Sequence, residues 1–202
     1  FVEQTLRQDI LSVLEYYRSE GFLDAVVELR DLAFSPERDE VTITIGVIEG
    51  ERYTVRSVEI EGGTSFPSDR SRLLELVRVQ EGGPRRDEEI IQTRNAIRDF
   101  YLENAYYDVQ IGLTSDDDAV AHTSALRFVI REGGPARIRR LDITGNTATR
   151  EDVIRRNLSV YPGGPLNSVE IEKSKSRLDA TRYFEPGSVE ARVIDTEEPA
   201  VK

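Results

Sequence analysis

Two groups of residues carry side chains of the kind that metal binding or acid–base catalysis requires. Asp116-Asp117-Asp118 places three carboxylates side by side, and His122 is the only histidine in the chain. A calcium loop needs six or more oxygen ligands at spaced positions and usually a distal glutamate, so three adjacent aspartates are more typical of a hairpin turn. One histidine in or beside a strand supplies neither a metal-ligand set nor a catalytic triad. We therefore predict no metal, no cofactor and no catalytic residue.

Glycine-rich turns are the next candidates, because glycine loops can hold phosphate groups. The sequence Gly-Gly-Pro occurs at residues 82–84, 133–135 and 163–165. None of these copies has the G-x-x-x-x-G-K-[ST] spacing of a phosphate-binding loop, so they are interpreted as turns. The absence of cysteine excludes disulfides, thiolate catalysis and cysteine zinc sites. The net charge of −11 disfavours nucleic-acid binding, and an enzyme of unfamiliar type is the least favoured function class.

The ends and apolar runs of the chain carry no targeting or membrane signal. No run approaches ~18 apolar residues, so no segment is predicted to span a membrane. No basic and then apolar segment opens the chain, so no signal peptide is predicted. Phe1 is not a natural start, and the chain is therefore interpreted as an excised fragment.

The glycine turns belong to a longer repeat. A strand-like segment ends at Glu49-Gly50 and another at Glu132-Gly133, and a second alternating segment follows each copy. The two glutamates are 83 residues apart, and so are Val58 and Leu141. Such a fixed period indicates tandem copies of one domain, each with only a modest core. Helix positions in the first two copies correspond as well, with Leu6, Val13 and Tyr17 matching Ile90, Ile97 and Tyr101.

Each copy is predicted to contain the same elements in the same order. Apolar residues at steps of three and four predict helices, and alternating runs predict strands. The first copy has a helix over 2–18 and strands over 22–32 and 41–45. The second has a strand over 53–60, helices near 65–77 and 87–101, and strands over 107–113 and 126–130. The third has a strand over 138–143, helices that start at Thr149 and Asn167, and a strand over 189–193.

These elements predict an α+β fold of tandem β-α-α-β-β domains, each a three-stranded mixed sheet with two helices on one face. The last strand takes the centre, because it pairs antiparallel with the strand before it and parallel with the first. The domains are predicted at residues 1–50, which lack the first strand and first helix, at 51–133, and at 134–202, which lack the final strand. The first and second strands then form edges whose unpaired backbone groups can accept an extended chain.

The second strand of each copy is the candidate surface for such a chain. In the complete copy this strand carries Tyr107, Val109, Ile111 and Leu113. The corresponding segments of the other copies are residues 22–29 and 189–193. The alternative is an edge that is protected by twist and charge and binds nothing.

By these residues the chain resembles POTRA domains, the periplasmic modules of BamA-type outer-membrane assembly proteins, over essentially its whole length. The most specific part is the third copy, where Gly145-Asn146, Arg155-Arg156 and Tyr183-Phe184 resemble the last, membrane-proximal domain. The segment from Tyr16-Tyr17 to Glu49-Gly50 resembles the end of the third of five domains. The resemblance implies the back of the third domain, the whole fourth and most of the fifth.

The resemblance also implies a location and a function. Such domains lie at the periplasmic face of the outer membrane, joined to their own C-terminal β-barrel. They receive unfolded outer-membrane proteins and dock accessory lipoproteins. The helix with Arg155, Arg156 and Asn157 would belong to a lipoprotein surface, although Asn157 stands where the family usually has glutamate. A POTRA array that serves polypeptide secretion or autotransporter assembly is the alternative.

A basic stretch of six arginines stands out in this acidic chain. It could meet an acidic partner or lipid headgroups. It could equally form a solvated face with local ion pairs to Asp142, Glu151 and Asp152, each worth little. The arginines are Arg137, Arg139, Arg140, Arg150, Arg155 and Arg156.

Overall fold

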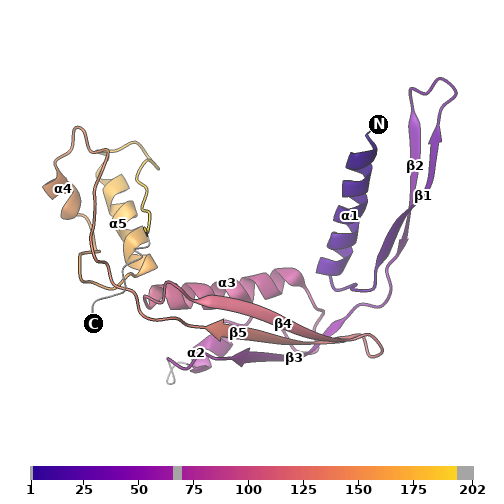
Figure 1. The fold of residues 1–202 in the computed structure, drawn as a ribbon, viewed down its shortest axis with the longest axis horizontal. Coiled ribbons are helices and arrows are strands. Elements are labelled where there is room, and N and C mark those ends of the chain that lie inside the picture. The colour runs from indigo at the N-terminus through magenta and orange to yellow at the C-terminus, as the bar shows by residue number, and fades with distance from the viewer. Residues whose placement is uncertain (1, 66–69, 195–202) are drawn as a thin grey trace. The chain divides into compact units, whose positions relative to one another are not determined.

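The computed structural model describes residues 2–65 and 70–194 of the 202-residue chain, and Figure 1 shows its elements. The chain divides into two compact units. One comprises Phe1–Arg98 with Gln110–Arg131, and the other comprises Asp99–Val109 with Glu132–Lys202. Within the described residues, no helix is long and apolar enough to cross a membrane.

The second copy of the repeat contains a three-stranded mixed sheet. Its strands are β3 (Thr54–Glu61), β4 (Gln110–Asp118) and β5 (Thr123–Arg131), in the spatial order β3-β5-β4. β5 pairs parallel with β3 and antiparallel with β4. The α+β class, the β-α-α-β-β order and the central position of the last strand are thereby confirmed.

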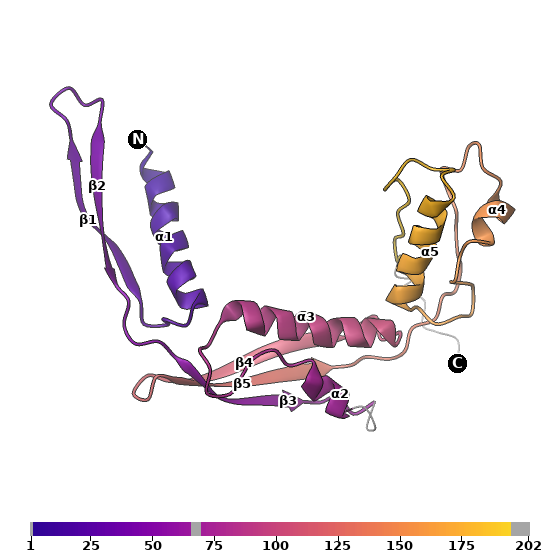
Figure 2. The ribbon, with the colours of Figure 1, turned by 180° about the vertical axis from the view of Figure 1, so that it is seen from behind.

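One face of β5 supplies the core of this sheet. Leu126, Phe128 and Ile130 are buried at alternating positions, as expected for a strand with one buried face. α2 (Arg70–Glu75) adds Leu73 and α3 (Asp87–Glu103) adds Ile97, both without exposed surface. Figure 2 shows α3 lying along the sheet. Each such side chain contributes ~1.5–3 kcal/mol when buried, so this layer stabilises the second copy.

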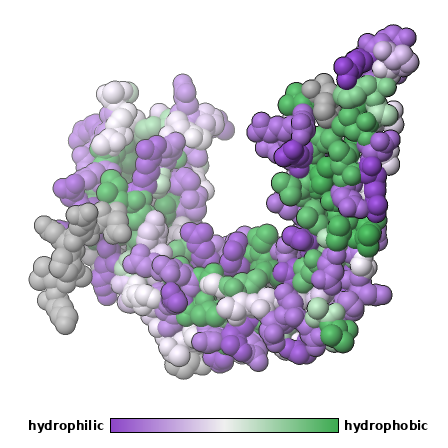
Figure 3. All heavy atoms as spheres, turned by 45° about the vertical axis from the view of Figure 1, so that its right-hand side comes forward, coloured by the Kyte–Doolittle hydropathy of each residue, from purple (hydrophilic) through white to green (hydrophobic). Residues whose placement is uncertain are grey.

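The first copy consists of a helix and a hairpin. α1 (Glu3–Ser19) is followed by β1 (Val26–Phe34) and β2 (Val41–Ile48), which pair antiparallel. The register shifts between Leu29 and Asp31, so Arg30 is the extra residue of a bulge. Apolar side chains gather over this helix and hairpin (Figure 3), and several on β2 are partly exposed, including Val47 and Ile48.

The strands that precede the central ones begin later than predicted. The expected strand over 107–113 is β4 over Gln110–Asp118, and the one over 22–32 is β1 over Val26–Phe34. The prediction that Asp116-Asp117-Asp118 forms the turn is therefore wrong, because these aspartates end β4. The turn lies just beyond, where Asp118 Oδ1 accepts from Val120 N at 2.9 Å and from Ala121 N at 3.0 Å.

The third copy forms its helices but not its predicted strands. α4 (Glu151–Arg155) and α5 (Ser168–Ala180) are present, and the Asn167 side chain caps α5 as predicted. Between 132 and 194 no strand forms, and only an isolated bridge joins Arg137 to Pro165. The strands expected over 138–143 and 189–193 are therefore absent. The physical reason lies in the topology: both edge strands of this fold pair only with the central strand, and the described part of this copy has none.

Candidate functional site

One edge of the three-stranded sheet is closed by the chain itself. At the start of β3, Val55 N donates to Gly83 O at 2.8 Å, and Gly82 N donates back to Val55 O at 2.7 Å. The Gly-Gly-Pro turn of residues 82–84 thus pairs with β3 much as a short strand would, and Pro84 also forms an isolated bridge with Thr54.

Side chains close the rest of this edge. Glu81 Oε1 accepts from Val58 N at 2.9 Å, and Arg70 Nη2 donates to Ile60 O at 3.1 Å. Outward backbone groups at the start, middle and end of β3 thus have partners, at Val55, Val58 and Ile60. The expectation that both the first and second strands present unpaired edges is wrong for the first strand.

The opposite edge is open. β4 is the outer strand of the sheet, and none of the described residues pairs with its second side. Its side chains are mostly exposed, so neither a helix nor a loop covers the strand. A strand with free N–H and C=O groups along one side is a template for another extended chain.

The predicted client residues separate into two sets. Ile111 and Leu113 lie in β4, where Leu113 pairs with Phe128 of β5. Tyr107 and Val109 lie before the strand begins. Val109 is buried, and its N–H donates to Tyr106 O at 3.4 Å, so this residue belongs to the turn and the core rather than to the open edge.

The open edge has an uneven charge. Asp116, Asp117 and Asp118 close its C-terminal end, and Asp116 pairs with Arg56 at 3.1 Å. Hydrogen bonds from Ala121 N and Val120 N lower the pKa of Asp118 and so keep this carboxylate ionised. The edge therefore offers apolar contacts in its first half and negative charge in its second.

The basic stretch is largely occupied by local ion pairs. Arg140 pairs with Asp142 at 2.8 Å, Arg150 with Asp152 at 3.1 Å, and Arg155 with Glu151 at 2.6 Å. Next to them, Arg156 Nε donates to Asp152 O and Asn157 Nδ2 to Val153 O. These contacts favour the interpretation as a solvated face. A role of Arg155, Arg156 and Asn157 in partner docking stays a prediction.

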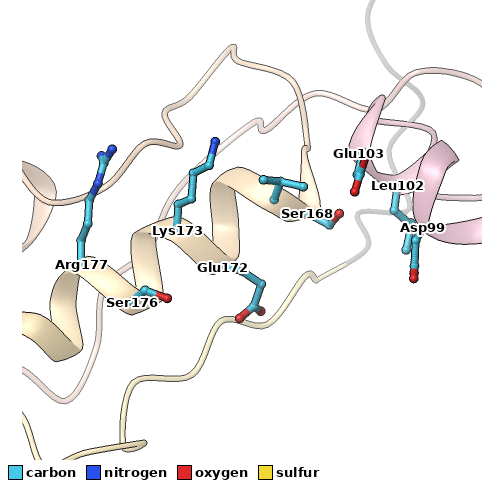
Figure 4. A pocket seen from close by; sticks show the side chains of 9 residues that line it. Asp99, Leu102, Glu103, Ser168, Glu172, Lys173, Ser176 and Arg177 are labelled. Atoms are coloured by element: carbon cyan, nitrogen blue, oxygen red, sulfur yellow. The ribbon is translucent and has the colours of Figure 1, made fainter. Parts of the chain in front are cut away.

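A shallow groove of about 660 Å³ lies between the last turn of α3 and α5. Lys173 and Glu172 project from α5 in different directions, as Figure 4 shows. Lys173 pairs with Glu170 at 2.6 Å, and Arg177 Nη1 donates to Ser159 Oγ at 2.7 Å. These charged groups serve local pairs, and no nucleophile and base converge among them, so we assign no chemistry to the groove. The described residues also contain no cluster of metal-binding side chains.

The repeated Glu-Gly sequence has a role that sequence reasoning missed. Glu49 Oε1 accepts from the Tyr17 hydroxyl at 3.1 Å, and Glu132 Oε1 accepts from the Tyr101 hydroxyl at 2.7 Å. Gly50 and Gly133 follow with φ of 75° and 67°, a region that glycine adopts without strain. The signal was present in the sequence, because the tyrosines recur 84 residues apart and the glutamates 83 residues apart.

The junctions after these glycines also repeat. Tyr53 N donates to Gly21 O at 2.8 Å, and at the equivalent place Ala136 N donates to Ala105 O at 2.7 Å. In turn Arg85 N donates to Tyr53 O at 2.9 Å, and Leu166 N donates to Ala136 O at 3.0 Å. Each new copy therefore begins on the backbone of the copy before it.

The complete second copy, with its β-α-α-β-β order and central last strand, defines a small α+β domain. The family model described as POTRA, surface antigen variable number repeat, matches residues 53–133 and 136–202. The chain belongs to the POTRA family.

Several curated relatives carry the name outer membrane protein assembly factor BamA. That of Nitratidesulfovibrio vulgaris is 24% identical over 201 residues, which cover 96% of this chain and 24% of that protein. That of Neisseria meningitidis serogroup B is 26% identical over 185 residues, which cover 92% of this chain and 23% of that protein. The chain thus spans about a quarter of the length of these relatives.

A solved structure extends the similarity to the arrangement of the elements. POTRA3-5 of Haemophilus influenzae BamA matches with a TM-score of 0.67 and 28% identity, covering 89% of this chain and 70% of that one. The predicted resemblance to POTRA domains of BamA-type assembly factors is confirmed by these matches.

Proposed function

We propose that this chain forms part of the periplasmic region of an outer-membrane protein assembly factor, where it acts as a non-catalytic scaffold. Residues 1–50, 51–133 and 134–202 would be the back of the third, the whole fourth and most of the fifth POTRA domain. The names of the relatives and the match to POTRA3-5 of a BamA support this assignment. The longer protein would then continue into a β-barrel in the outer membrane.

The open edge of β4 is the proposed binding site for unfolded outer-membrane proteins. The observation that carries this proposal is the contrast between the two edges: β3 is closed by Gly83, Glu81 and Arg70, whereas β4 has no partner on its outer side among the described residues. Backbone hydrogen bonds to an added strand would give affinity without demanding one sequence. That suits a scaffold that must accept many clients.

Charge would add a preference to this site. The three aspartates at the end of β4 favour a bound segment with basic residues at the matching end and disfavour an acidic one. Ile111 is half-buried and Leu113 is partly exposed, so they would meet apolar residues of the bound strand. Accessory lipoproteins would dock elsewhere, and Arg155, Arg156 and Asn157 of the third copy are the candidates for that surface.

The decisive test uses a ten-residue peptide copied from a strand of an outer-membrane β-barrel protein. N-methylation of alternate residues removes the N–H groups on one edge of the extended peptide, and shifting the pattern by one residue removes those on the other edge. Strand addition predicts that one series weakens binding more than about tenfold, because several hydrogen bonds are lost together. The other series should bind nearly as the parent peptide does.

Crosslinking locates the bound peptide. A photoreactive residue at Thr114 in β4 should capture it, and the same residue at Glu59 in β3 serves as the matched control, since both positions are exposed strand residues. Equal binding of the two N-methyl series would exclude strand addition, and equal capture from both strands would exclude β4 as its site.

A further inference from the structure

The junction between the first and second copies is held by charged side chains as well as by the backbone. Arg52 Nη2 pairs with Glu20 Oε2 at 3.0 Å, and its Nε donates to Glu20 O at 2.7 Å. Arg86 approaches the same carboxylate at 3.6 Å.

The other side of the junction contains the only histidine of the chain. The turn between β4 and β5 brings His122 to the first copy, where its Nδ1 lies 3.7 Å from Asp24 Oδ2. The same carboxylate accepts from the Tyr53 hydroxyl at 2.9 Å, and the rings of Tyr53 and His122 meet edge to face at 5.4 Å. Three segments that are distant in sequence thus converge on one carboxylate.

The backbone of His122 is held in an uncommon conformation for this contact. Its φ is 49°, in the left-handed region, where a residue other than glycine is worth attention. The carbonyl of His122 accepts from Thr54 N at 3.0 Å, which ties the turn to the start of β3. The turn therefore presents the imidazole to Asp24 from a fixed position.

A proton on the Nδ1 atom of His122 would strengthen its attraction to the Asp24 carboxylate. This nitrogen is buried and has no hydrogen-bond partner within the described residues, although a carboxylate faces it. Neutral imidazole gains little from that carboxylate, whereas imidazolium is attracted to it. Charged groups of both signs lie around His122 and its neighbours Tyr53 and Asp118. They are Asp24, Asp117 and Asp118 on the acidic side and Arg56 on the basic side.

The second junction lacks this arrangement. Asp108 occupies the position of Asp24, but Ala136 replaces Tyr53 and Pro135 replaces Arg52. The backbone bonds are the same in both junctions, and the side-chain contacts are specific to the first. Repetition of the fold therefore does not account for them.

We propose that Asp24 and His122 form a pH-sensitive latch, which holds the tip of the β4–β5 hairpin against the first copy more tightly as histidine gains its proton. Histidine is the side chain that changes charge between pH 5 and 8. A partly exposed pair of this kind changes the equilibrium between closed and open junction by a factor of about 2–5.

Nuclear magnetic resonance tests the contact directly, because one histidine gives one set of imidazole signals. The titration midpoint of these signals should move to lower pH in Asp24→Asn, which keeps an oxygen for the Tyr53 hydroxyl but removes the charge. Asp108→Asn is the matched control at the second junction and should leave the midpoint unchanged. An unchanged midpoint in Asp24→Asn would overturn the proposal.

Spin labels test whether the contact holds the junction. The chain has no cysteine, so cysteines at Thr42 in β2 and Thr114 in β4 would carry the only labels. The distance distribution between them should be narrower at pH 5.5 than at pH 8 in the parent chain. His122→Asn, which tolerates the left-handed conformation, should abolish that difference. A distribution that does not change with pH in the parent, or that narrows equally in His122→Asn, would overturn the latch.

Discussion

Tyr101 donates its hydroxyl hydrogen bond to Glu132 at 2.7 Å, and Tyr17 and Glu49 make the same contact in the preceding copy at 3.1 Å. Each pair joins the end of a helix to the end of a central strand. Because the glutamate directly precedes the glycine of the junction, the contact also fixes where one copy ends. The repeated Glu-Gly sequence is thus explained by a hydrogen bond and a backbone angle together.

Removal of the Tyr101 hydroxyl tests the contribution of this contact. Tyr101→Phe keeps the buried ring and deletes the donor to Glu132, so the free energy of unfolding should fall by ~1–2 kcal/mol. Tyr17→Phe should cost less, because the hydrogen bond of Tyr17 is exposed to solvent. Urea unfolding of both variants measures the difference, and an equal loss would show that burial does not distinguish the two contacts.

Because of the same tyrosine, we expect the free energy of unfolding to fall at alkaline pH. Burial, followed by the hydrogen bond to Glu132, raises the pKa of Tyr101 above its ordinary value of 10.0. As the pH rises, the unfolded chain therefore loses this proton before the folded chain does. The contribution of the protonated Tyr101 hydroxyl to the free energy of unfolding is fully present below pH 10 and declines as the pH rises further. The slope should be no steeper than ~1.4 kcal/mol per pH unit. Tyr101→Phe should show a flatter profile between pH 9 and 11.

Equivalent positions at the two junctions should respond differently to substitution. Gly21 has φ of 99°, and a Cβ there would lie 2.6 Å from Arg85 O. Gly21→Ala should therefore destabilise the fold by ~2–4 kcal/mol, from backbone strain and the clash. Ala105, its counterpart, has φ of 67° and is 5% exposed. Ala105→Gly relieves strain but loses a buried methyl group, so its net effect should stay within ~1 kcal/mol.

The sequence was sufficient to predict the order of the strands in the sheet, but not which edge strand is closed or where β4 begins. Periodicity and the repeat predicted that β5 is central, because that place allows both an antiparallel hairpin with β4 and a parallel pairing with β3 after the long crossover. Closure of β3 could not be predicted, since Glu81 and Arg70 reach Val58 and Ile60 only after the chain has folded. The start of β4 was placed too early because Tyr107 and Val109 are apolar, although Val109 serves the core.

The basic stretch should contribute little to folding. Arg140 and Arg150 are 80% and 82% exposed in their side chains, and each pairs with an aspartate two residues away. Replacing either by alanine should change the free energy of unfolding by less than ~0.5 kcal/mol. If the stretch binds an acidic partner, affinity should instead fall in these variants and with added salt. Salt titration of binding and urea unfolding together separate the two roles.

Removing the side chains that close the outer edge of β3 tests directly why β4, and not β3, is open to pairing with another strand. Glu81→Ala with Arg70→Ala removes the side chains that satisfy Val58 N and Ile60 O, and leaves two free groups on β3. Edge strands with free groups pair with other chains, so this variant should capture the strand peptide at β3 and self-associate at high concentration. Glu61→Ala in the same strand is the control, because its carboxylate pairs with Arg127 rather than with the backbone. Photocrosslinking from β3 and sedimentation measure both effects. A monomeric double variant with no capture at β3 would mean that strand twist, and not these two side chains, protects the edge.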